Sequence, residues 1–174
     1  MPNADVDSHA ALPTIVVLAT GGTIAGSGSQ GRATNYRPGQ IGIEDLVGCV
    51  PGIDAVAHVR GMQICNVNSD DITGAHWIAL ARTIDELAVR TDIDGFVVTH
   101  GTDTMDETAY FLNLTVKTDK PVVLTGSMRP ATATSADGPM NLFQALSLAA
   151  SPDARGRGVM VAFSDAIFGG RDVR

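Results

Sequence analysis

Short apolar runs that lead directly into turns of glycine and hydroxyl residues constrain the fold of this chain more than any other feature. The run at residues 95–99, Gly-Phe-Val-Val-Thr, has the composition of a buried strand. A glycine turn follows it, and then a helix that we expect to begin near Met105, with Thr104 or Asp103 as its N-cap. The strand therefore delivers Thr102 and Asp103 side by side at its carboxyl end, where open parallel sheets bind ligands.

The alternation of buried strands and amphipathic helices continues along the chain. Runs of branched apolar residues predict strands, and apolar residues at helical spacing predict helices. Alternating strands and helices predict an α/β fold with a doubly wound, mainly parallel sheet of about five or more strands. We expect strands at residues 14–19, 54–59, 61–67, 95–99, 121–125 and 158–164. We expect helices over residues 41–50, 72–89, 105–116 and 139–150, and a polar end at residues 165–174.

The charge of the chain argues against two classes of partner. The formal net charge is −7 and no run of Lys or Arg is present, whereas a surface for nucleic acid or for an anionic membrane needs a basic patch. No apolar stretch approaches the ~20 residues of a membrane span. The two cysteines, Cys49 and Cys65, lack the spacing of a zinc site, so we expect small core residues, with a disulfide between them left open.

The chain is expected to form one domain behind a short tail. Residues 1–12 are small, polar and acidic and predict a flexible tail, and residues 13–174 predict a single α/β domain. The N-terminal residues do not have the pattern of a secretory signal, so we expect a cytoplasmic protein, or a periplasmic one if a signal has been removed. The polar residues 26–40 predict a lid that carries Tyr36.

Four strand-to-helix turns are expected to lie together at one edge of the sheet. They share hydroxyls, carboxylates and glycines, and they comprise residues 20–23, 69–71, 100–104 and 126–129. Turn formers and N-caps explain any one of them equally well, but the four together favour a ligand site. His100 is the best-placed histidine, and beside a buried strand we interpret it as a structural donor.

The sequence offers no support for a nucleotide site or for a serine hydrolase. Residues 20–23, Thr-Gly-Gly-Thr, match neither the dinucleotide fingerprint nor the lysine-bearing phosphate loop, and no G-x-S-x-G elbow occurs. A threonine nucleophile remains. Its hydroxyl is weak at neutral pH and needs an adjacent base, for which Tyr36 and Asp103 are the candidates in this chain.

Four motifs of the chain resemble those of one enzyme family. Residues 19–25, Ala-Thr-Gly-Gly-Thr-Ile-Ala, and residues 99–105, Thr-His-Gly-Thr-Asp-Thr-Met, resemble the two signature motifs of the bacterial-type L-asparaginases and glutaminase-asparaginases. Residues 126–130 and 135–142 resemble further blocks of that family. The sequence of residues 107–112 is closer to the type II branch than to other members.

The resemblance implies hydrolysis of the side-chain amide of asparagine, often also of glutamine, without cofactor or metal and in a homotetramer. By position, Thr23 resembles the nucleophile, and Tyr36 resembles the lid residue that helps to activate it. Thr102 resembles the second catalytic threonine, and Asp103 also belongs to the implied catalytic group. Asp103 and Ser69 resemble the residues that bind the substrate's α-amino and α-carboxylate groups, which matches the preference of an ammonium for a carboxylate.

Two further site positions and three departures complete the resemblance. Ser127 lies where the family contacts the amide that is cleaved, and Asp70 stands where the family commonly has Gln or Glu to meet the ammonium. The disulfide of some exported type II members has no counterpart, since Thr118 and the segment near Arg90 hold no cysteine. The chain stops at Arg174, before the family's catalytic lysine and smaller C-terminal domain, so we expect this chain alone to be nearly inactive.

Two other interpretations stay open at this point. An asparaginase-like subunit of a tRNA amidotransferase has the same threonine motifs but passes its ammonia to a partner, and it normally carries an extra N-terminal domain. A non-catalytic module would use the same polar edge to bind small amino acids. Replacement of Thr23 separates enzyme from module, because only an enzyme has turnover to lose.

Overall fold

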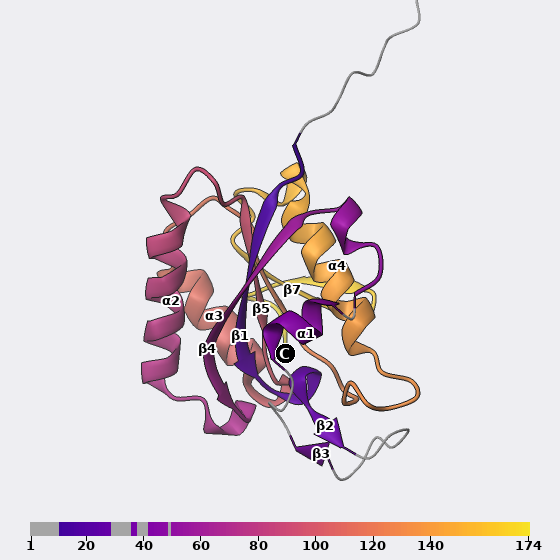
Figure 1. Ribbon diagram of the computed structural model, residues 1–174. Coiled ribbons are helices and arrows are strands. Elements are labelled where there is room, and N and C mark those ends of the chain that lie inside the picture. The colour runs from indigo at the N-terminus through magenta and orange to yellow at the C-terminus, as the bar shows by residue number, and fades with distance from the viewer. Residues whose placement is uncertain (1–10, 29–35, 38–41, 49) are drawn as a thin grey trace, which may run out of the picture.

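The central feature of the computed structural model, which describes residues 11–28, 36–37, 42–48 and 50–174, is a six-stranded sheet (Figure 1). Its strand order is β4-β1-β5-β6-β7-β8; the first five strands are parallel and β8 is antiparallel to β7. The predicted α/β class and mainly parallel sheet are therefore confirmed. The strands are β1 (Thr14–Gly21), β4 (His58–Val67), β5 (Gly95–Thr99), β6 (Val122–Thr125), β7 (Val159–Phe163) and β8 (Ala166–Gly169), with a separate pair β2 (Ser27–Gly28) and β3 (Tyr36–Arg37).

Helices cover both faces of the sheet, which makes the central strands apolar on each side (Figure 1). In β5, Val97 packs with the cluster under α1 and α4, whereas Phe96 and Val98 pack with the cluster under α2 and α3, because successive strand residues point to opposite faces. All five residues of β5 are buried, as predicted. The helices are α1 (Ile43–Gly48), α2 (Gly74–Ala88), α3 (Met105–Thr115) and α4 (Gly138–Ala150).

One prediction for the edge next to β1 is wrong. The two strands expected at residues 54–59 and 61–67 are the single strand β4, and Ile53–Ala55 forms a 3-10 turn before it. Gly61 does not interrupt β4, because β1 pairs with it on both sides of this position and Val17 lies opposite Gly61. The pairing with a buried neighbour outweighs the poor strand propensity of glycine.

The second error concerns residues 165–174, which were expected to be a polar end but contain β8. A tight turn at Ser164 and Asp165 returns the chain against β7, and these two residues have positive φ values of 50° and 64°. Hairpin turns of this kind favour left-handed residues and are usually signalled by glycine or asparagine. Ser-Asp gives no such signal in the sequence.

The tail, the lid and one cysteine fall largely outside the described residues. These are residues 1–10, most of residues 26–40, and Cys49. Cys65 is a free thiol on β4 and is half-buried at the sheet edge, so it is not the core residue that we expected. It donates to the carbonyl of Thr20 at 3.4 Å, and burial raises the pKa of the thiol. Among the described residues, no helix has the length and apolar character needed to cross a membrane.

Candidate active site

The four predicted turns follow four strands that are neighbours in the sheet. Strands β4, β1, β5 and β6 are adjacent and parallel, so their carboxyl ends meet at one edge. Hydrogen bonds join the turns: the amide of Gly22 donates to the carbonyl of Val67 at 3.2 Å, and the amide of His100 donates to that of Thr125 at 2.8 Å. The prediction that these turns share one edge is confirmed.

Glycines let the backbones of these turns approach one another very closely. Gly22 has φ +78°, and a Cβ atom on it would lie 2.5 Å from the backbone nitrogen of Gly101. A Cβ atom on Gly101 would lie 2.6 Å from Oγ of Ser69. Real Cβ atoms do not come this close to other heavy atoms, so the turns after β1 and β5 require glycine at these positions.

The best-defined pair of the site is Ser69 with Asp103. Oγ of Ser69 donates to Oδ2 of Asp103 at 2.8 Å, and the amide of Asp103 donates back to that hydroxyl oxygen at 3.3 Å. Ser69 is buried, with 5% of its surface exposed, whereas Asp103 is exposed. A buried hydroxyl therefore fixes the orientation of a carboxylate that solvent and ligands can reach.

Thr104 occupies the N-cap position of α3 but does not cap the helix with its side chain. Its hydroxyl donates instead to the carbonyl of Ser69 at 2.7 Å. The expected capping role of Thr104 or Asp103 is therefore wrong, because both side chains are used to join the turn after β5 to the turn after β4. The hydroxyl of Thr104 bonds a carbonyl that is distant in sequence and not a backbone amide of α3.

Thr102 lies beside Asp103, and both line a pocket of about 390 Å³. The other walls of the pocket are mostly apolar and include Met105, Met128 and Phe163. Val173 and Arg174 line another side of the pocket. The pocket thus combines a hydroxyl and a carboxylate with an apolar surround, as ligand sites commonly do.

Three of the remaining predicted site residues lie in the turns that follow β1, β4 and β6. Thr23 is half-buried and begins the 3-10 turn Thr23–Ala25, directly after the glycine that touches Gly101. Asp70 is exposed in the turn that Ser69 begins. Ser127 is fully buried, and its hydroxyl donates to the carbonyl of Arg129 at 2.9 Å. The side chain of Tyr36 lies outside the described residues.

His100 is buried behind the turn and is linked to both α2 and α3. Its Nδ1 lies 2.7 Å from the carbonyl oxygen of Gly101, and its Nε2 lies 2.9 Å from Oγ1 of Thr108, which accepts from Nε1 of Trp77 at 2.8 Å. A carbonyl only accepts, so Nδ1 carries the proton and, in the neutral ring, Nε2 accepts from Thr108. Burial lowers the pKa of His100. The structural role that we expected for this histidine is confirmed.

Sequence reasoning missed two residues at the start of α4 that hold the turn after β6. The carboxylate of Asp137 accepts from the amides of Met128 and Arg129, both at 2.9 Å. Nδ2 of Asn141 donates to the carbonyl of Gly126 at 2.9 Å. An Asp before Gly-Pro at a helix start looks like an ordinary cap, so nothing in the sequence pointed to this role.

The structure defines a doubly wound α/β domain with hydroxyls and an exposed carboxylate at the carboxyl edge of its parallel strands. Residues 14–174 match the family model described as "Asparaginase, N-terminal", and the chain therefore belongs to the asparaginase family. The resemblance stated from the motifs is confirmed.

Named relatives are about 50% identical to the chain over the residues that align. It is 50% identical over 170 residues to a glutaminase-asparaginase of Pseudomonas fluorescens biotype A, which covers 97% of the chain and 47% of that protein. It is 52% identical over 163 residues to L-asparaginase 2 of Escherichia coli K12, covering 94% of the chain and 46% of the relative. The crystal structure of a probable cytoplasmic L-asparaginase from Campylobacter jejuni matches with TM-score 0.88 and 50% identity over 91% of the chain and 49% of that structure. The chain thus spans about half the length of the relatives it matches.

Proposed function

We propose that this protein hydrolyses the side-chain amide of L-asparagine, with L-glutamine as a second substrate, to the acid and ammonia. The observation that carries the proposal is the pair of Ser69 and Asp103 beside Thr102, in a chain of the asparaginase family. An exposed carboxylate at Asp103 suits the α-ammonium of an amino acid, and the Ser69 hydroxyl suits its α-carboxylate. One similar relative is named an L-asparaginase and another a glutaminase-asparaginase, so the names of the relatives include both substrates.

In the proposed reaction, Thr23 is the nucleophile and attacks the carbonyl carbon of the side-chain amide. The hydroxyl proton passes to a base, for which Tyr36 is proposed, and the amide nitrogen leaves as ammonia after it has gained a proton. The resulting ester is then attacked by water, which releases the acid and restores Thr23. Thr102 is proposed to handle this water, because it lies in the pocket next to Asp103.

Four further features of the family remain proposals for this protein. Asp70 and Ser127 are proposed to contact the ammonium and the cleaved amide, respectively, from the turns after β4 and β6. A homotetramer is the proposed assembly. A cytoplasmic location is also proposed: one relative of known structure is named a probable cytoplasmic enzyme, although another, from Haemophilus influenzae, is named a probable periplasmic one.

The test is ammonia release and aspartate formation from L-asparagine by the full-length gene product, with L-glutamine in parallel. Thr23→Ala and Thr102→Ala should each lower turnover by at least about 10²-fold while L-aspartate still binds. Thr83→Ala is the matched control, since its hydroxyl only bonds the carbonyl of Ala79 on α2. Binding of L-aspartate without any turnover would instead indicate a binding module. Ammonia production that requires a partner protein would indicate an amidotransferase subunit.

A further inference from the structure

The carboxylate of Asp137 makes contacts that are unusual for a residue at the start of a helix. It stands at the N-cap position of α4 but makes no side-chain cap to that helix, and its own backbone is α-helical, with φ −93° and ψ −16°. Both carboxylate oxygens instead accept backbone amides from the turn after β6: Oδ2 from Met128 and Oδ1 from Arg129, each at 2.9 Å. Nε of Arg129 also lies 3.5 Å from Oδ1.

The first turn of α4 also bonds the first residue of the Gly126–Arg129 turn and the neighbouring β7–β8 turn, through the side chain of Asn141. Nδ2 of Asn141 donates to the carbonyl of Gly126 at 2.9 Å and lies 3.3 Å from Oδ2 of Asp137, so the two side chains support one another. Oδ1 of Asn141 accepts from the amide of Ser164 at 3.2 Å, which links the unit to the β7–β8 turn. Three residues of the loop, Gly126, Met128 and Arg129, are therefore bonded through their backbones to side chains at the start of α4.

The first residue of α4 also contacts the turn after β1. A Cβ atom on Gly138 would lie 3.0 Å from Cγ1 of Ile24 and 3.6 Å from Cβ of Ser127. Ile24 is buried, with 1% exposed, and follows Thr23 directly in the chain. The start of α4 thus lies against two of the four turns at the carboxyl edge.

We propose that Asp137 is a positioning residue of the active site. Its carboxylate holds the Gly126–Arg129 turn in the conformation seen here, and the helix that starts beside it keeps this turn and the Thr23 turn at a fixed separation. The inference rests on the proposed function for its effect on turnover, because Thr23 and Ser127 belong to the proposed site. Its effect on the turn itself is independent of that function.

The physical reason for a position-specific effect is the number of acceptors that the side chain offers. A carboxylate accepts on both oxygens, whereas an asparagine side chain accepts on one and presents an NH₂ group where the other stood. Asp137→Asn therefore leaves one of the two amides of Met128 and Arg129 facing another donor. The loss falls on the turn and on the bond to the Asn141 side chain, and the backbone of α4 loses no cap, since the carboxylate makes no side-chain cap to that helix.

The first experiment measures amide hydrogen exchange in the full-length gene product. Asp137→Asn should speed exchange at Met128 and Arg129 by about tenfold or more, because bonds to a charged acceptor are lost. Asp119→Asn is the matched control; its carboxylate is exposed and pairs with Arg155 on the surface. Unchanged exchange at Met128 and Arg129 in Asp137→Asn would overturn the proposal, whether or not the protein has asparaginase activity.

The second experiment separates positioning from simple loss of stability. Asp137→Asn should lower kcat for L-asparagine by about tenfold, with KM changed less than threefold, at a temperature well below the melting temperature of the variant. Gly138→Ala should lower kcat in the same way without faster exchange at Met128, because its Cβ would press on Ile24. Gly74→Ala at the first residue of α2 is its control, since among the residues that the structure describes no atom lies within 4 Å of a Cβ there.

The two proposals fail in different ways. A wild-type protein without turnover contradicts the proposed function, and the exchange measurement then still decides the role of Asp137 in the turn. A wild-type enzyme whose Asp137→Asn variant has a lower melting temperature but normal kcat and KM contradicts positioning and assigns Asp137 a structural role only. Faster exchange together with lower kcat, and neither change in Asp119→Asn, supports it.

Discussion

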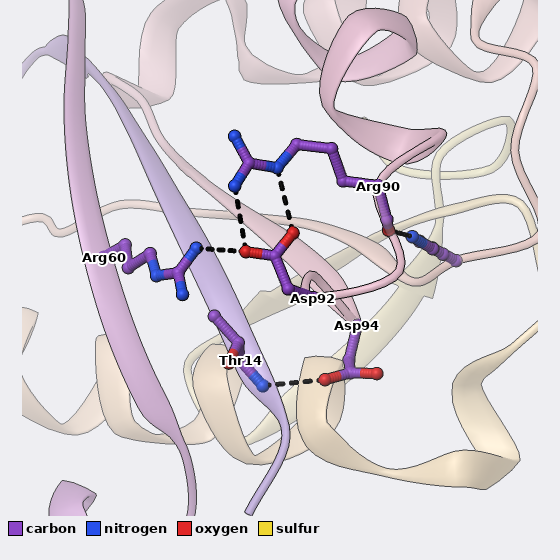
Figure 2. A network of polar contacts seen from close by, with 6 residues as sticks. Thr14, Arg60, Arg90, Asp92 and Asp94 are labelled. Carbon is purple, nitrogen blue, oxygen red and sulfur yellow. Dashed lines mark hydrogen bonds and ion pairs between the residues drawn. The ribbon is translucent and has the colours of Figure 1, made fainter.

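The two edges of the parallel sheet are held together in different ways. At the carboxyl edge, where the candidate site lies, the turns approach one another closely: Gly22 lies against the backbone of Gly101, and Gly101 lies against the side chain of Ser69. At the amino edge, charged side chains make the connections, and Figure 2 shows their arrangement. Asp92 accepts from Nη1 of Arg60 at 2.8 Å and from Nη2 of Arg90 at 2.9 Å.

The amino edge also contains two hydrogen bonds between Thr14, the first residue of β1, and Asp94, the residue before β5. Oδ2 of Asp94 accepts from the amide of Thr14 at 2.8 Å (Figure 2), and the amide of Asp94 donates to the carbonyl of Thr14 at the same distance. The ion pairs beside it are open to water, with about half of each side chain exposed. Exposed pairs of this kind stabilise a fold only weakly.

Because their contacts differ, the two edges of the sheet tolerate substitutions to different degrees. Contacts between backbones depend on excluded volume, so an added methyl group at the carboxyl edge must displace a neighbouring strand end. Contacts between exposed charges depend on solvent screening and can be lost with little strain. The carboxyl edge, which holds the candidate site, is therefore the sterically stricter one: a Cβ atom on Gly22 would lie 2.5 Å from a backbone atom, against 2.9 Å for Gly95 at the amino edge. This suits a site whose groups must keep fixed distances.

The largest effect is expected from Gly22→Ala. The new Cβ would lie 2.5 Å from the nitrogen and 2.6 Å from the Cα of Gly101, both backbone atoms, so the turn after β1 or β5 must move. We expect a loss of about 3–5 kcal/mol in the free energy of unfolding, measured by urea denaturation, because overpacking adds to the strain of a left-handed alanine.

Gly52→Ala separates these two causes. Gly52 has the same φ of +78°, but no atom of the described residues lies within 4 Å of a Cβ atom there. Only the left-handed conformation costs free energy at this position, about 1–2 kcal/mol. Equal losses for Gly22→Ala and Gly52→Ala would show that backbone packing at the carboxyl edge contributes nothing, and the comparison of the two edges would then be wrong.

The strands and turns of the carboxyl edge were easier to predict from the sequence than the hydrogen bonds between those turns. Strand 95–99 and the four polar turns were predictable because buried parallel strands are apolar throughout and their turns lie at one edge by topology. The bond from Thr104 to the carbonyl of Ser69 was not, since a hydroxyl before a helix has a local partner that explains it equally well. Contacts across 34 or 35 residues of chain leave no pattern in one sequence.

Asp137 and strand β8 were missed for a related reason. In each case the decisive partner is distant or the local signal is absent: the amides of Met128 and Arg129 for Asp137, and a glycine-free turn at Ser164 for β8. The resemblance of the motifs supplied the proposed roles of the site residues, which neither periodicity nor composition gives. The carboxyl edge of the sheet and the kinds of side chain that lie there were predictable from the sequence. The hydrogen-bond partners of these side chains are known only from the structure.

A smaller effect is expected from the titration of His100, which lies behind the carboxyl edge. Burial lowers the pKa of His100, so below its ordinary value near 6.5 the unfolded chain binds a proton that the folded chain does not. Stability should therefore fall as the pH falls, by at most about 1 kcal/mol between pH 7 and pH 5.5. His100→Gln keeps a donor and an acceptor but does not titrate, so its stability should lack this dependence.

The comparison with the amino edge makes the measurement more specific. Urea denaturation of both proteins at several pH values gives the two slopes, and repetition in 1 M NaCl tests their cause. Desolvation of a buried ring is barely screened, so the difference between wild type and His100→Gln should persist in salt. Identical slopes for the two proteins between pH 7 and pH 5.5 would contradict the buried, neutral state of His100.

The smallest effect is expected from Asp92→Asn at the amino edge. The guanidinium groups of Arg90 and Arg60 hold the pKa of Asp92 well below its usual range, so the pair persists down to about pH 4, and its contribution is lost only as the pH falls further. The variant should lower the melting temperature by at most about 3 °C at low salt, and by less in 1 M NaCl, where exposed charges are screened. Asp94→Asn is its counterpart, because an amide oxygen can still accept from Thr14 and no ion pair is lost. A salt-independent loss in Asp92→Asn as large as that of Gly22→Ala would remove the distinction between the two edges.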